Sequence, residues 1–156
     1  MIKYIKTGIA KFICTYFSFS LEGEDKILLQ LLPKSGKYLD IGCSHPIKGN
    51  NTFMLYLFGW SGTCVDIRKQ GRWWLRKRDD YIIDTVTNLS GYSLFDLLDL
   101  DVDGIEESLL RTLTHHPKWI LVECCLPQQS GVDSYLKSIG YFLRASTSRN
   151  NLYEKL

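Results

Sequence analysis

Residues 37–67 read KYLDIGCSHPIKGNNTFMLYLFGWSGTCVDI and contain the pattern that decides the fold. The stretch holds two short apolar runs, YLDI and TCVDI, each bounded by glycine. Between them, Asn50 or Asn51 can cap a short helix over residues 52–58. A strand, a helix and a second strand in this order predict two parallel strands joined by a helical crossover.

The same alternation continues on both sides of this stretch. Outside it, we expect helices over residues 22–32, after Asp103 and after Ser130, and strands over residues 81–86, 119–125, 141–145 and 151–156. The run LFDLLDLDV at residues 94–102 fits either a strand or a helix. The pattern therefore predicts one α/β domain over residues 21–156, with a mostly parallel sheet covered by helices on both faces.

The composition is that of a folded protein. Hydrophobic residues make up 45% of the 156 residues, and the net charge is +2. This near-neutral balance argues against non-specific coating of nucleic acid. The five cysteines form no C-x-x-C pair, and no histidine is placed to complete a zinc site. We therefore expect small buried thiols in a reducing compartment, and no metal.

The first twenty residues form an amphipathic pattern. Apolar residues recur on one helical stripe, with three lysines off it, at Ile2, Ile5, Ile9, Phe12, Ile13 and Tyr16. We interpret residues 1–20 as an N-terminal helix packed on the domain. The alternatives are a helix whose residues 2–16 lie on an anionic membrane, and a secretory signal. No stretch approaches the ~20 apolar residues of a spanning helix, so we expect a cytoplasmic protein, with membrane association as the alternative.

Three predicted strands carry an acid at or near their ends: Asp40, Asp66 and Asp101. In sheets of this kind, ligands bind at the carboxyl ends of the strands, and an acid after the second strand holds a ribose diol. Gly42 would let the backbone approach such a ligand closely. Neither the G-x-G-x-x-G fingerprint nor a P-loop is present. The acids indicate an adenosine-containing ligand, with helix capping as the alternative.

Several short motifs together resemble the FkbM-type methyltransferase family. They are DIG-x-x-HP at residues 40–46, NNT at 50–52, LY-x-x-GW-x-G at 55–62 and LDVDG-x-E at 100–106. The resemblance covers roughly residues 22–145. It implies a seven-stranded class I methyltransferase fold of the Rossmann-like type, with S-adenosylmethionine as the cofactor. It also implies O-methylation of a hydroxyl on a sugar or polysaccharide precursor, so that the partner is a small-molecule or glycan acceptor.

The resemblance also assigns roles to single residues. It implies a cofactor site formed by Asp40, Gly42, Cys43, Ser44, Asn51, Thr52, Asp66, Ile67 and Asp84. In this assignment Asp66 holds the ribose hydroxyls, and the residues near Asp84 lie close to the adenine. Asp101 faces the methyl group that is transferred.

Methyl transfer from a sulfonium is an in-line displacement, and a hydroxyl acceptor benefits from a general base. Asp101 and His45 are the candidate catalytic residues, because both should reach the open end of the sheet. For His45 the alternative is a hydrogen bond that fixes the loop beside Pro46. Asp101 with Asp103 could instead hold a divalent cation, but we explain Asp103 as the cap of the next helix.

The link between the third and fourth strands departs from the family pattern. Only TNLSGYSLFD, at residues 87–96, stands where family members carry a longer stretch. This compact link removes part of the expected acceptor pocket. It therefore favours a second interpretation, a non-catalytic cofactor-binding or scaffold protein with the methyltransferase fold.

Residues 68–78 hold six basic side chains and no acid, with Trp73 and Trp74 between them. Such a segment could hold a phosphate-bearing acceptor, or it could stack the bases of a single-stranded nucleic acid. A nucleic-acid methyltransferase or binder is therefore a third interpretation, although the overall charge argues against it. The structural alternative is a solvated helix whose tryptophans pack on the sheet.

Overall fold

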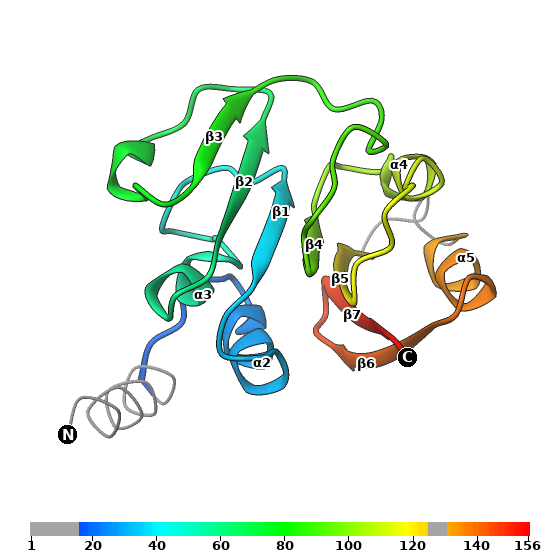
Figure 1. Ribbon diagram of the computed structural model, residues 1–156. Helices are drawn as coiled ribbons and strands as arrows, with labels where there is room; N and C mark the ends of the chain where they lie inside the picture. Colours follow the sequence, from blue (N-terminus) through cyan, green and yellow to red (C-terminus); the bar gives the residue numbers. More distant parts are fainter. Residues whose placement is uncertain (1–15, 125–130) are drawn as a thin grey trace.

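The computed structural model describes residues 16–124 and 131–156, whose strands form a single seven-stranded sheet (Figure 1). The strands are β1 (Lys37–Ile41), β2 (Ser61–Asp66), β3 (Asp80–Ile83), β4 (Leu97–Leu100), β5 (Trp119–Glu123), β6 (Tyr141–Ser146) and β7 (Asn150–Lys155). The helices are α2 (Glu24–Leu31), α3 (Phe53–Leu57), α4 (Glu106–Leu110) and α5 (Gly131–Ser138), with a 3₁₀ turn η1 (Trp73–Leu75).

The strands lie in the order β3-β2-β1-β4-β5-β7-β6. Each pair from β3 to β5 is parallel, whereas β7 runs antiparallel to both β5 and β6. The chain moves outward from β1 to β3 and then returns to β4 on the other side of β1. This confirms the predicted fold class, and it assigns the ambiguous run at residues 94–102 to a strand.

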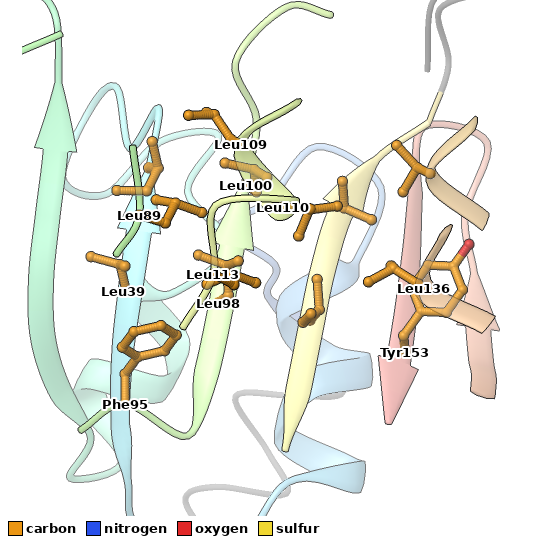
Figure 2. Packing of buried hydrophobic residues seen from close by; sticks show 14 of the residues in the cluster. Leu39, Leu89, Phe95, Leu98, Leu100, Leu109, Leu110, Leu113, Leu136 and Tyr153 are labelled. Carbon is orange, nitrogen blue, oxygen red and sulfur yellow. The ribbon is translucent and has the colours of Figure 1, made fainter. Parts of the chain in front are cut away.

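Helices cover the two faces of the sheet, α2 and α3 on one side and α4 and α5 on the other (Figure 1). Two buried clusters fill the spaces between. One packs Leu28 and Leu55 of the helices against one face of the sheet. The other packs Leu110 and Leu136 against Leu98 and its neighbours on the opposite face (Figure 2). Because β4 and β5 are buried along their whole length, their sequences read as continuous apolar runs rather than alternating ones.

Side-chain caps were predicted at three helix starts, of which Ser130, before α5, lies outside the described residues. The other two differ. At α3, the N-cap residue is Thr52, which makes no side-chain cap hydrogen bond, so neither Asn50 nor Asn51 is the N-cap. The Asn50 side-chain oxygen instead accepts the backbone N–H groups of Thr52 and Phe53 from the turn before the helix. At α4, the prediction that Asp103 caps the helix is wrong. The Glu106 carboxylate instead accepts the backbone N–H groups of the loop before the helix, and no side chain caps the helix start.

No helix forms between β3 and β4 within the described residues, so the predicted compact link is confirmed. Residues 84–96 cross the sheet in an irregular path, and Val86 and Leu89 join the buried cluster on the α4–α5 side. The link thus fills part of the space that a crossover helix would take.

The predicted N-terminal helix lies almost wholly outside the described residues. Within the described part of its range, residues 17–20 follow an irregular path, so they are not helical. Among the helices that the structure describes, none has both the length and the hydrophobicity that crossing a membrane would require.

Candidate functional site

A cleft of about 250 Å³ opens at the carboxyl ends of β1, β2 and β3. It is lined by Ile41, Gly42, Val65, Asp66, Ile67, Arg68, Asp84, Thr85, Val86, Val102, Asp103 and Ile105. The cleft lies where the chain changes direction across β1, which is the place where α/β sheets bind ligands. Its volume is near the lower end, about 300 Å³, of the usual range for ligand pockets.

Gly42 ends β1 with a φ of +83°, in the left-handed region that favours glycine. A Cβ atom at this position would lie 1.8 Å from the backbone carbonyl oxygen of Asp101, which follows β4. The glycine is therefore required by the close approach of two strand ends. The predicted reason, an approach of the backbone to a ligand, stays a prediction, and Gly42 lines the cleft.

Asp66 ends β2 with its carboxylate held by two backbone N–H groups. Ser44 donates to Oδ2 over 2.8 Å, and Arg68 donates to Oδ1 over 2.9 Å. Each carboxylate oxygen has a second lone pair, so both can still accept a hydrogen bond from a ligand. The two N–H groups fix the direction in which a ligand would meet this acid.

Four of the residues that the resemblance assigned to a cofactor line this cleft: Gly42, Asp66, Ile67 and Asp84. Sequence reasoning missed the rest of the lining. Thr85 and Arg68 are immediate neighbours of predicted residues, so widening each assignment by one residue would have found them. Ile105 gave no signal, because an apolar residue before a helix is most simply read as core.

Asp40, Asn51 and Thr52 do not line the cleft. Asp40 is buried on the α2–α3 side of the sheet, where it accepts the Thr52 hydroxyl over 2.6 Å. Asn51 donates to the Asp99 carboxylate over 3.2 Å. Asp40 and Asp66 therefore do not share one crevice as predicted, because Asp40 lies within β1 rather than at its end. These polar groups attach the start of α3 to the sheet.

Burial raises the pKa values of two acids in this region, Asp40 and Asp99. It raises the pKa of Asp40 to about 6, although the nearby Arg76 guanidinium and the Thr52 hydroxyl act in the opposite direction. It raises the pKa of Asp99 well above its ordinary value, and the neighbouring Asp40 carboxylate adds to that rise. Both carboxyl groups thus favour their neutral forms more than a solvated aspartate does.

Arg76 is buried beside this group, on the same side of the sheet. Its guanidinium pairs with Asp79 over 2.6 Å and donates to Asn50, Thr52 and the Tyr38 hydroxyl. It therefore joins the segment after β2 to the loop after β1. The sequence pattern of solvent-exposed basic residues gave no sign of this role.

The other predicted loop residues hold the loop in place. Cys43 is buried, and the Ser44 carbonyl accepts the Trp73 indole N–H over 3.2 Å. His45 uses Nδ1 to accept the backbone N–H groups of Ile47 and Lys48, over 3.1 and 3.0 Å. This is the loop-fixing arrangement considered as the alternative for His45, and His45 is not among the residues that line the cleft.

Asp101 lies next to the cleft, at the carboxyl end of β4. One oxygen of its carboxylate and one each of the Asp103 and Glu123 carboxylates lie within 4.8 Å of one another. Burial, then the negative charge of Glu123, raises the pKa of Asp101 to about 7. Such oxygens could hold a divalent cation, but Arg149 already pairs with Glu123 over 2.8 Å.

The charged groups of the cleft are mostly negative. Asp66, Asp84 and Asp103 line it, whereas Arg68 is the one basic side chain in its lining. Phosphate groups would meet repulsion here, and the glycine-rich loop that would offset it is absent. A neutral or cationic nucleoside suits these walls better than a dinucleotide does.

The fold resembles that of a solved methyltransferase domain. The chain matches the C-terminal domain of precorrin-6Y C5,15-methyltransferase from Rhodobacter capsulatus with a TM-score of 0.59 and 14% sequence identity. The match covers 83% of this chain and 85% of the other, and at this identity it shows the fold alone. No known protein family and no curated protein matches the sequence, so the resemblance to the FkbM-type family stays a prediction.

Proposed function

We propose that the chain binds S-adenosylmethionine in the cleft at the carboxyl ends of β1–β3 and acts as a methyltransferase. The observation that carries the proposal is the Asp66 carboxylate, oriented by two backbone N–H groups at the rim of a cleft whose acids favour a cation. The similarity of the fold to a methyltransferase domain supports it. When bound, this cofactor supplies a methyl group activated by a positively charged sulfur.

Different lining residues would bind different parts of the cofactor. Asp66 accepts the two ribose hydroxyls, as acids at this place in α/β sheets do. Ile67 and Ile105 are exposed apolar side chains in the cleft lining, and they shield a flat base from water. The acids of the cleft attract the sulfonium charge, and the absence of a phosphate cradle disfavours nucleotides.

Asp101 is the residue that we assign to proton removal from the acceptor. Its pKa of about 7 suits a general base at neutral pH, because both protonation states are then populated. The Glu123 carboxylate and its Arg149 partner fix the electrostatic environment of this acid. His45, with Nδ1 already accepting two N–H groups, is the weaker candidate for this step.

The acceptor that we propose is a hydroxyl of a sugar or polysaccharide precursor, and the support for it is the sequence resemblance alone. The cleft residues support the choice of cofactor and say nothing of the acceptor. Release of S-adenosylhomocysteine in the presence of candidate glycans, compared with single-stranded RNA, would identify the acceptor class.

The binding step is tested by thermal unfolding with S-adenosylmethionine and with its demethylated product. A ligand that binds the native state raises the melting temperature. We expect both compounds to raise it, and NAD to leave it unchanged. We expect Asp66→Ala to abolish the rise, because the ribose then loses its acceptor.

Asp80→Ala is the matched control for this experiment. Asp80 is exposed and begins β3, at the opposite end of the sheet from the cleft. It should keep the full rise in melting temperature. A rise that survives Asp66→Ala would mean that the ribose site is misplaced, and the absence of any rise with the unchanged protein would refute the proposed function.

A further inference from the structure

The segment between β2 and β3 forms a loop beside the edge strand β3, at the left of the view in Figure 1. It holds six basic residues, but the structure gives them two different roles. Arg76 is buried in its ion pair with Asp79. Arg78 stacks its guanidinium 4.0 Å from the centre of the Tyr56 ring and donates to the Tyr56 carbonyl.

The other four basic side chains of the loop are exposed, and none of them takes part in an ion pair with a described residue. Three apolar side chains are exposed among them. We call these seven residues the basic loop surface: Ile67, Arg68, Lys69, Arg72, Trp74, Leu75 and Lys77.

The two tryptophans of the loop point in different directions. Trp73 is buried, stacks on Tyr81 with ring centres 4.5 Å apart and donates to the Ser44 carbonyl. This contact anchors the loop to the sheet, as the structural alternative expected for a tryptophan. Trp74 is 70% exposed, so the loop holds a large apolar ring in water, together with four cations that form no ion pair with a described residue.

Charge and apolar side chains together favour an anionic lipid bilayer over a nucleic acid as the partner. Single-stranded nucleic acids need successive aromatic platforms, and this loop exposes one aromatic ring. A nucleic acid would also leave Leu75 in water, whereas the interface of a bilayer would bury it. Tryptophan itself prefers the depth of the lipid headgroups.

The charge of the rest of the chain fixes which side faces the lipid. Six of the 19 basic residues and one of the 17 acidic residues, Asp79, lie in this loop, so the remaining 13 basic residues are outnumbered by 16 acidic residues. An anionic surface therefore attracts the loop and repels much of the remaining molecule. We propose that the basic loop surface docks the protein on anionic membranes, with Trp74 and Leu75 inserted among the headgroups.

The proposal goes beyond the proposed function and does not depend on it. Two residues of the basic loop surface, Ile67 and Arg68, also line the cleft. Docking through this loop would therefore bring the mouth of the cleft close to the membrane surface.

The test is sedimentation of the full chain with vesicles of phosphatidylcholine alone or with added phosphatidylserine. We expect binding only to the anionic vesicles, weakening as salt rises. Each basic residue near an anionic surface changes the partition coefficient about fivefold, so Arg72→Gln with Lys77→Gln should lower it about 25-fold. Neither residue lines the cleft or takes part in the buried contacts.

Lys34→Gln with Lys48→Gln is the control with the same loss of charge. Both lysines are exposed and lie outside the loop, so this variant should bind nearly as well as the unchanged protein. An equal loss in both double variants would overturn the proposal, because it would show a response to net charge alone. Binding lost through Lys3→Gln with Lys6→Gln, and kept by the loop variant, would overturn it too.

Fluorescence gives a second, independent readout. The other three tryptophans, Trp60, Trp73 and Trp119, are buried. Brominated lipids should therefore quench mainly Trp74, and Trp74→Phe should lose that quenching while the protein still sediments. No quenching in bound protein would contradict the insertion of Trp74. Binding to single-stranded RNA through Arg72 and Lys77, without binding to vesicles, would identify the other partner and refute the proposal.

Discussion

Asp40 and Asp99 face each other across neighbouring strands and are both buried. Burial raises the pKa of each above the ordinary value of about 3.9 in an unfolded chain. The contribution of these two acids to the free energy of unfolding is therefore greatest below about pH 4. It falls as the pH rises towards their pKa values in the folded protein.

Asp99→Asn should remove part of the fall in the free energy of unfolding that occurs as the pH rises. The Asn51 side chain can still donate to the replacement, because an amide oxygen accepts as a carboxylate does. We expect the variant to gain stability over the unchanged protein as the pH rises from 4 to 7, by at most about 1.4 kcal/mol per pH unit. Urea unfolding at several pH values measures this difference. Asp80→Asn, at an exposed site, should show none, and an advantage of Asp99→Asn that is independent of pH would contradict the argument.

The role of Asp101 as the general base predicts how the rate of methyl transfer depends on pH. Its pKa of about 7 implies that methyl transfer accelerates as the pH rises through 7, because the deprotonated form accepts the proton. Asp101→Asn should slow transfer about 10²-fold or more while the melting temperature still rises with the cofactor.

Glu123→Gln separates this role from a structural one. The Glu123 charge raises the pKa of Asp101, so its removal should move the rate profile to lower pH. If the dependence of the rate on pH stayed unchanged in Glu123→Gln, Asp101 would not be the group whose titration controls the rate. If Asp101→Asn also lost the rise in melting temperature with the cofactor, Asp101 would serve cofactor binding instead of proton removal.

At the level of single residues, position in a strand decided which of the predicted site residues line the cleft. Asp66 is the last residue of β2, Asp84 follows β3, and both line the cleft. Asp40 lies two residues before Gly42, inside β1, and the alternation of side chains sends it to the face under α3. Sequence reasoning placed both acids near strand ends, but it did not resolve a difference of one or two residues.

At the scale of elements, the meeting of β1 and β4 depends on Gly42. Gly42→Ala would place a methyl group against the Asp101 carbonyl and would also force an alanine into a left-handed conformation. We expect a loss of about 2–4 kcal/mol in the free energy of unfolding, together with weaker cofactor binding, since both strand ends border the cleft. Chemical unfolding measures the first effect.

Gly91→Ala is the matched control, because nothing lies within 4 Å of a Cβ at Gly91. Its effect should stay within about 0.5 kcal/mol. A similar loss for both variants would mean that the close approach of β1 and β4 is not what requires Gly42.

The elements themselves were largely predictable, because their signals are local. Apolar runs between glycines gave β1 and β2, and Asn50 or Asn51 predicted the start of α3 to within two residues of its N-cap, Thr52. The start of α4 was misread, since Asp103 and Glu106 match a capping box in sequence. In the structure Asp103 has a φ of +56°, and Glu106 reaches back alone to the loop. The burial of Arg76 depends on the loop after β1, which a local pattern cannot show.

At the scale of the whole molecule, the sheet is shared by two cores. Leu28 of α2 is buried on one face and Leu98 of β4 on the other, and both belong to large clusters. Because the same strands form the wall of both clusters, neither core can be lost while the other keeps its packing. The described part of the chain should therefore unfold as one cooperative unit.

Leu28→Ala and Leu98→Ala test this cooperativity from the two sides. Each should lower the free energy of unfolding by about 2–5 kcal/mol, since each leaves a cavity in a filled core. Leu57→Ala, on the exposed side of α3, should cost far less. In all three variants, unfolding followed by tryptophan fluorescence and by far-ultraviolet circular dichroism should give coincident transitions. Two separate transitions in either core variant would show that the α2–α3 side and the α4–α5 side are independent, against the argument from a shared sheet.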